Sequence, residues 1–250
     1  MGGRLISATA SVKSVSARQA KASRLAVIAR RRTPAPRLAP FGSTIRKRRY
    51  AYTSLTIELM EVTNLLDIHT RKELYQWYLE NHDKVSDIWL RVNRAAADCP
   101  GVVRYVDAVE IALCFGWIDS TMKSIDDGKP VQHFTPRRKG SNWCERNLIR
   151  CRRLVHLGEM TPAGLTVAPD LDPSRFVFED WVLDAIKADE TAWVNYRSFP
   201  ETYRRIRVDY IQHYRQTGRE EQAQKALRRF VQDCHTGRMQ PGWDDLGRLK

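Results

Sequence analysis

The sequence predicts an α+β fold, with a small antiparallel sheet and packed helices followed by a helical C-terminal region. Three observations lead to this prediction. Alternating apolar residues mark strands in the first half of the folded part, helix-spaced apolar residues fill its second half, and the acid-free N-terminus has the composition of a disordered basic tail. We therefore divide the chain into a tail at residues 1–57, an α+β domain at 58–168 and a helical region at 169–250.

The N-terminal tail accounts for the whole net charge. Thirteen of the 42 Lys and Arg residues lie in residues 1–57, so the other 29 are balanced by the 29 Asp and Glu residues of the folded part. The high isoelectric point therefore gives no support for nucleic-acid binding by the folded part. The tail itself fits an upstream extension with Met60 as the working start, a mitochondrial transit peptide, or a basic arm for nucleic acid or anionic lipid.

Capping and turn signals define the elements of the α+β domain. Thr70 begins a predicted helix that runs through residue 82, with Glu73 completing a capping box. Alternation predicts a strand over residues 86–93. The following elements are an apolar helix from Tyr105 to Trp117, strands at 120–125 and 130–135 joined by the turn 126–129, a helix from Trp143 to Leu157 capped by Ser141 or Asn142, and a second cap at Thr161-Pro162.

The C-terminal region reads as helical throughout. A short amphipathic helix is expected over residues 178–188, and Pro200 opens a longer one. Gly218 separates this helix from a last one, whose apolar face includes Phe230. The last two helices are predicted to form an antiparallel pair.

Three separated motifs occur in a fixed order: EIALCFGWIDSTMKSIDD at 110–127, HFTPRRKGSNW at 133–143 and GEMTPAG at 158–164. With them the chain resembles the YdeI/OmpD-associated family, also called bacteriocin-protection proteins, from about Leu66 to the C-terminus. The resemblance implies an α+β N-terminal region and a bacterial cytoplasmic protein of the stress or protection type. It implies no particular reaction.

The loop after the predicted hairpin is a candidate anion site. Arg137 and Arg138 precede a helix start, where free backbone N–H groups and the positive dipole end suit phosphate or carboxylate. The aromatic residues Phe134 and Trp143 bracket the loop and indicate a pocket wall. The alternative is a solvated basic turn. The predicted ligand-binding residues are Trp117, Asp119, Lys123, Arg137, Arg138, Asn142 and Trp143.

A catalytic role is the alternative to binding. Asp119 could act beside Lys123 in acid–base work on a small anion, or it could be a structural carboxylate. Cys114 is a weak candidate nucleophile, because Asp107 and Glu110 on the same helix face would raise the pKa of its thiol. A second alternative is nucleic-acid binding through the basic tail and the C-terminal helices.

The sequence indicates no cofactor and no metal. Its five cysteines lack a Cys-x-x-Cys spacing, and it has no glycine-rich phosphate loop and no His-Glu-x-x-His motif. No apolar run approaches the length of a transmembrane helix. The expected location is the bacterial cytoplasm, or the mitochondrion if the tail is a transit peptide. Ligand identity, oligomeric state and catalytic activity stay open.

Overall fold

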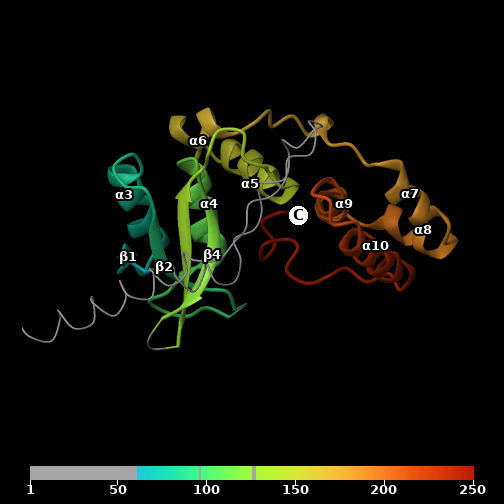
Figure 1. The fold of residues 1–250 in the computed structure, drawn as a ribbon, viewed down its shortest axis with the longest axis horizontal. Coiled ribbons are helices and arrows are strands. Elements are labelled where there is room, and N and C mark those ends of the chain that lie inside the picture. Colours follow the sequence, from blue (N-terminus) through green and yellow to red (C-terminus); the bar gives the residue numbers. More distant parts are fainter. Residues whose placement is uncertain (1–60, 96, 126–127) are drawn as a thin grey trace, which may run out of the picture. The chain divides into compact units, whose positions relative to one another are not determined.

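The computed structural model describes residues 61–95, 97–125 and 128–250. These residues form an α+β unit followed by a helical region, which confirms the predicted fold class (Figure 1). The predicted disordered tail, the start at Met60 and the turn residues Asp126 and Asp127 lie outside the described residues. Within the described part of the chain, no helix has the length and apolar character needed to cross a membrane.

The α+β unit holds five strands and four helices among the described residues, and the helical region holds four α-helices after a short 3-10 turn. In chain order the elements are β1 (Leu65–Leu66), α3 (Arg71–Asn81), β2 (Ile88–Asn93), β3 (Val103–Arg104), α4 (Tyr105–Cys114), β4 (Trp117–Ser124), β5 (Pro130–Pro136), α5 (Glu145–His156), α6 (Pro162–Val167), η1 (Pro173–Arg175), α7 (Asp180–Lys187), α8 (Glu190–Ser198), α9 (Glu201–Gln216) and α10 (Glu220–His235).

The sheet is mixed rather than purely antiparallel. β2, β5 and β4 pair antiparallel in that order, whereas β1 and β3 each pair parallel with β2. The antiparallel arrangement is therefore right for the three long strands, and the two short parallel strands were not predicted. β1 and β3 contain two residues each, which is too short for an alternating pattern to reveal them.

Thr70 caps α3, as predicted, by accepting a hydrogen bond from the backbone N–H of Glu73 at 3.1 Å. The Glu73 carboxylate in turn accepts from the N–H of His69 at 2.9 Å, one residue earlier than a standard capping box. Leu79 of this helix is 52% exposed.

The helix at the centre of the core is α4. Every residue from Asp107 to Cys114 is buried, and the helix packs against α3, α5, α6, β2 and β4. Its predicted end at Trp117 is wrong, because Gly116 adopts a φ of 76° and stops the helix. Trp117 instead begins β4.

The short helix α6 closes the C-terminal end of α4. Thr161 caps α6, as predicted, by accepting from the N–H of Gly164. The Thr161 hydroxyl also donates to the Cys114 carbonyl oxygen at 2.5 Å, and the backbone N–H of Thr161 donates to the same oxygen at 3.2 Å. Two of the three sequence motifs are therefore in direct contact.

The start of α5 differs from the prediction. The helix begins at Glu145 rather than Trp143, and its N-cap residue Cys144 makes no side-chain cap. Neither Ser141 nor Asn142 supplies the expected capping bond. The Asp209 carboxylate of α9 accepts the helix's free backbone N–H instead.

The C-terminal helices pack on one another through an aromatic core. The helix predicted over 178–188 is α7, and α8 was not predicted. Gly218 separates α9 from α10, which pack together. Phe230 of α10 is fully buried and makes edge contacts with Tyr196 and Tyr203.

Candidate functional site

Arg137 is positioned by the end of β5. Its backbone N–H donates to the Gly116 carbonyl at 2.9 Å, and its side chain is only 8% exposed. One terminal nitrogen donates to the Asn142 carbonyl at 3.2 Å, and the guanidinium carbon lies 3.5 Å from the centre of the Trp143 ring. This stacking holds the loop between β5 and α5 in a compact form.

Arg137 faces a cavity of about 560 Å³ that we call the arginine cavity. The cavity lies among β4, the loop before α5, α5 itself and α9. Its lining residues are Ile118, Arg137, Asn142, Trp143, Cys144, Arg146, Asn147, Ile206, Arg207, Asp209, Tyr210 and His213.

Positive charge dominates this lining. Three arginines contribute, Arg137, Arg146 and Arg207, against one lining carboxylate, that of Asp209. Arg146 is also paired, at 3.5 Å, with the Asp245 carboxylate behind the lining. Burial lowers the pKa of Arg137 and of Arg146, because desolvation penalises the charged form. The Nε atoms of Arg137 and Arg207 are buried and have no hydrogen-bond partner among the residues that the structure describes. Since these atoms are closed to solvent, an anion in the cavity would meet the outer parts of the two guanidiniums rather than Nε.

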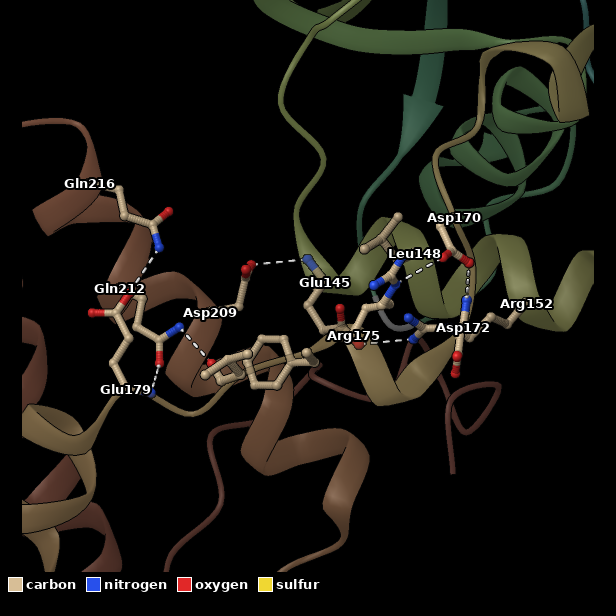
Figure 2. Close-up of a pocket in the computed structure, with 12 residues that line it drawn as sticks. Glu145, Leu148, Arg152, Asp170, Asp172, Arg175, Glu179, Asp209, Gln212 and Gln216 are labelled. Atoms are coloured by element: carbon tan, nitrogen blue, oxygen red, sulfur yellow. Dashed lines mark hydrogen bonds and ion pairs between the residues drawn. The ribbon is translucent and has the colours of Figure 1, made fainter.

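Asp209 is the group that caps α5. Its carboxylate accepts from the backbone N–H of Glu145 at 3.0 Å, as Figure 2 shows. Burial raises the pKa of Asp209 from 3.8 to about 6, and the nearby Glu145 carboxylate adds to the rise. Burial also lowers the pKa of His213, and the positive charge of Arg219 lowers it further.

Asp209 also borders a second cavity, of about 350 Å³, drawn in Figure 2. The acidic groups there are satisfied by neighbours. Asp170 accepts from Arg175 at 3.0 Å, and Glu179 accepts from Gln216 at 3.0 Å. Because these groups are already paired, we give this cavity no functional role.

Three of the seven predicted ligand-binding residues line the arginine cavity: Arg137, Asn142 and Trp143. Arg138 is exposed and is not part of the lining. Trp117 is 1% exposed, and its indole N–H donates to the His82 carbonyl at 3.1 Å, inside the core.

Asp119 and Lys123 do not form the predicted acid–base pair. β4 has a bulge between Asp119 and Met122, so Asp119 lies opposite Phe134 and Lys123 lies opposite Val131. Phe134 and Val131 are three residues apart on β5 and therefore point to opposite faces, which places Asp119 and Lys123 on opposite faces of the sheet.

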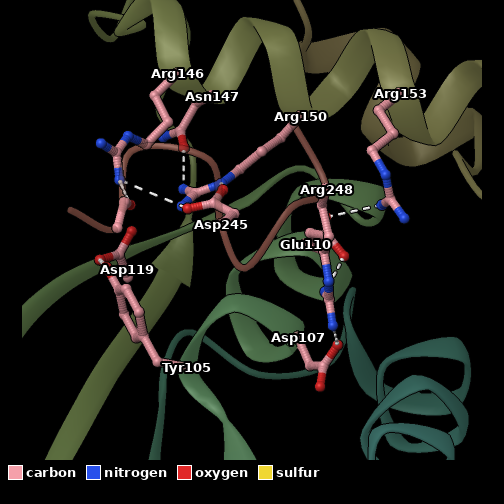
Figure 3. A network of polar contacts seen from close by, with 11 residues as sticks. Tyr105, Asp107, Glu110, Asp119, Arg146, Asn147, Arg150, Arg153, Asp245 and Arg248 are labelled. Atoms are coloured by element: carbon pink, nitrogen blue, oxygen red, sulfur yellow. Dashed lines mark hydrogen bonds and ion pairs between the residues drawn. The ribbon is translucent and has the colours of Figure 1, made fainter. Parts of the chain in front are cut away.

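Asp119 has a structural partner. The Tyr105 hydroxyl donates to its carboxylate at 2.6 Å, and the two side chains point toward one another in Figure 3. Burial, together with the Asp119 charge, raises the pKa of Tyr105 to about 12. The structural interpretation of Asp119 accounts for these contacts without a ligand.

Cys114 is fully buried, and burial raises the pKa of its thiol to about 12, with a further contribution from the Glu159 carboxylate. The thiolate needed for nucleophilic attack is therefore absent near neutral pH. The carboxylates of Asp107 and Glu110 on the same helix are held by Arg248 at 2.8 and 2.7 Å (Figure 3).

His133 has a structural role. Its Nδ1 lies 3.0 Å from the Ser120 hydroxyl, its Nε2 lies 3.0 Å from the Asp87 carboxylate, and its ring stacks on Trp89. Both ring nitrogens are thus engaged.

The part of the cavity formed by α9 was missed in the sequence. Arg207, Tyr210 and His213 follow one another at steps of three, so they share one side of the helix. That spacing was the available signal, and Tyr210 is 46% exposed.

Among the residues that the structure describes, no group of His, Cys, Asp and Glu side chains could hold a metal ion.

A family model described as a domain of unknown function (DUF8412) matches residues 66–167, which run from β1 to the end of α6. The match includes the loop that carries Arg137 but none of α9. Comparisons with curated proteins and with solved structures gave no significant match.

Proposed function

We propose that the protein binds a small organic anion in the arginine cavity. The observation that carries the proposal is the position of Arg137, a cation that is only 8% exposed, lines the cavity and has no carboxylate paired with it among the described residues. Burying a charge without an opposite charge is costly. An anionic group in the cavity would supply that opposite charge and form charge-assisted bonds with the guanidinium.

The rest of the lining supports an anion with an apolar or aromatic body. Ile118, Ile206 and the rings of Trp143 and Tyr210 give apolar surface beside the three guanidiniums. A volume of about 560 Å³ lies within the range of small-molecule sites. A carboxylate, sulfonate or phosphate ester on a ring would match both kinds of surface.

Binding is preferred over catalysis because the lining offers no activated nucleophile. Cys144 is exposed at the surface, yet desolvation of its sulfur raises the pKa of the thiol, and the nearby Asp209 carboxylate raises it further. This thiol therefore stays protonated near neutral pH. The acid–base alternative requires Asp119 and Lys123 to lie side by side, but they lie on opposite faces of the sheet. From the resemblance to the YdeI/OmpD-associated family, we also propose that this binding serves a stress or protection role in the bacterial cytoplasm.

The test is thermal unfolding with increasing benzenesulfonate, using wild type, Arg137→Ala and the exposed control Arg138→Ala. Stabilisation should grow as RT ln(1 + [L]/Kd) in wild type and in the control. Arg137→Ala should weaken binding by at least about tenfold, since it removes a buried charged donor. Arg137→Lys should recover part of the affinity, because an ammonium keeps the charge but lacks the planar fork.

Equal stabilisation of wild type and a folded Arg137→Ala variant would overturn the proposal. The proposal would also be overturned if Arg138→Ala reduced the stabilisation by benzenesulfonate as much as Arg137→Ala does. That result would indicate a general effect of surface charge rather than binding at one site.

A further inference from the structure

A third cavity adjoins the arginine cavity. It has a volume of about 420 Å³ and lies between α9 and α10. It shares two lining residues with the arginine cavity, Arg207 and Tyr210. The lining of this cavity is Arg207, Tyr210, Tyr214, Gln222, Lys225, Ala226, Arg229 and Gln240.

The lining of this third cavity is cationic without a carboxylate. Lys225 and Arg229 are four residues apart on α10, so their side chains lie on the same face. Together with Arg207 they surround the cavity with three positive charges. Gln222 and Gln240 add neutral hydrogen-bonding groups.

The boundary between the two cavities combines a cation with aromatic surface. The guanidinium carbon of Arg207 lies 5.3 Å from the Tyr210 ring centre. The hydroxyls of Tyr210 and Tyr214 are 2.7 Å apart, and their rings are in edge contact at 4.9 Å. A planar group lying across this boundary would contact the tyrosine rings while its charged ends reach arginines on both sides.

We infer that the two adjoining cavities form one elongated site for a ligand with two anionic groups joined by a planar, ring-containing body. The inference rests on the proposed function, because the first anionic group occupies the arginine cavity. The second group is held by Arg207, Lys225 and Arg229. The combined linings place five cationic side chains beside the one lining carboxylate, that of Asp209, and Asp245 pairs with one of the five, Arg146. The remaining positive charge suits a bis-anion better than a single charge. Phosphorylated nucleosides have this chemistry.

Calorimetric titration with adenosine 3′,5′-bisphosphate, adenosine 5′-monophosphate and adenosine keeps the ring constant while the number of phosphates changes. The bisphosphate should bind at least about tenfold more tightly than the monophosphate, which corresponds to one added charge-assisted contact. Adenosine should bind most weakly.

The double variant Lys225→Ala/Arg229→Ala should remove the advantage of the bisphosphate and leave the monophosphate affinity unchanged. The matched control is Arg228→Ala, since Arg228 is exposed on the same helix but outside the lining. Both variants change exposed side chains, so they should fold normally.

Failure of this inference can be told apart from failure of the proposed function. Suppose that Arg137→Ala lowers the affinity for the monophosphate but wild type binds the bisphosphate no more tightly than the monophosphate: the elongated site is then contradicted and the arginine cavity is supported. Equal loss of affinity for both phosphates in the double variant would also contradict the second subsite. If Arg137→Ala changes the affinity for neither ligand, both the arginine cavity and the elongated site are contradicted.

Discussion

Gly164 packs directly on the Cys114 carbonyl group, so closely that a Cβ atom added to Gly164 would lie 2.3 Å from the Cys114 oxygen. The nearest contact is rigid backbone, which cannot move aside as a flexible side chain could. The contact explains why a glycine-containing motif at 158–164 accompanies the motif around Cys114.

Replacing Gly164 with Ala should therefore destabilise the protein. A clash with backbone forces α6 away from α4, and overpacking of this kind costs about 1–3 kcal/mol or more. Urea unfolding of Gly164→Ala measures the loss. Leu165→Ala is the matched control, because Leu165 is on the same helix and is 48% exposed. An unchanged midpoint for Gly164→Ala would show that α6 does not sit against α4 as described.

Arg248→Ala should also destabilise the protein, by about 2 kcal/mol, since it removes a partner from a buried carboxylate. Glu110 is 1% exposed, and burial raises its pKa although Arg248 and Arg153 lower it. Chemical denaturation at neutral pH measures the effect. Arg175→Ala should cost little, because its ion pair with Asp170 is exposed. A similar small loss for Arg248→Ala would mean that the C-terminal segment does not hold Glu110.

Phe230→Ala should cost about 3–5 kcal/mol, as expected for an aromatic residue removed from a packed core. Phe230 has no exposed surface and contacts Tyr196, Tyr203 and Arg207. Val194→Ala, at a 53% exposed position, serves as the control for equilibrium unfolding. A loss below about half a kcal/mol for Phe230→Ala would contradict the packing of α10.

Asp209→Asn should make the protein more stable at pH 8 and leave it nearly unchanged at pH 4. The folded pKa of about 6 exceeds the ordinary 3.8, so the buried charge opposes folding above pH 6, and this cost disappears as the carboxyl is protonated. Asparagine keeps an oxygen for the Glu145 N–H but carries no charge. The gain at pH 8 should be roughly 1–3 kcal/mol.

Urea unfolding at the two pH values provides the comparison for Asp209→Asn. A gain of the same size at pH 4 and pH 8 would exclude the carboxyl charge as its cause. The same charge opposes an anion in the arginine cavity. Benzenesulfonate, which does not titrate in this range, should therefore bind wild type more tightly at pH 5 than at pH 8, and this dependence should weaken in Asp209→Asn.

Local signals in the sequence were sufficient for much of the fold. Thr70 and Thr161 cap the helices they were expected to cap, and Gly218 separates the last two helices. Helix caps and helix-terminating glycines depend on residues close in the sequence, so they can be recognised from a single sequence. The parallel strands β1 and β3 are defined only by their pairing with β2, and no local pattern reveals them.

In the candidate site, too, features set by neighbouring residues could be predicted, whereas features set by distant residues could not. Arg137 and Trp143 lie six residues apart in one loop, so the sequence could indicate both. The cap of α5 could not be predicted, because Asp209 reaches Glu145 across 64 residues of chain. Likewise, the bulge in β4 that separates Asp119 from Lys123 has no sequence signature that would have shown it.

The Arg137 guanidinium, which lines the arginine cavity, gives the most direct test of this site. Its Nε–H proton can be followed by ¹H–¹⁵N NMR during a benzenesulfonate titration, with assignment from the Arg137→Lys spectrum. The proposal predicts a saturable shift of this signal with the same Kd as calorimetry, while the exposed Arg138 signal stays in place. An Arg137 Nε–H signal that does not move while calorimetry reports binding would contradict the assignment of this cavity as the anion site.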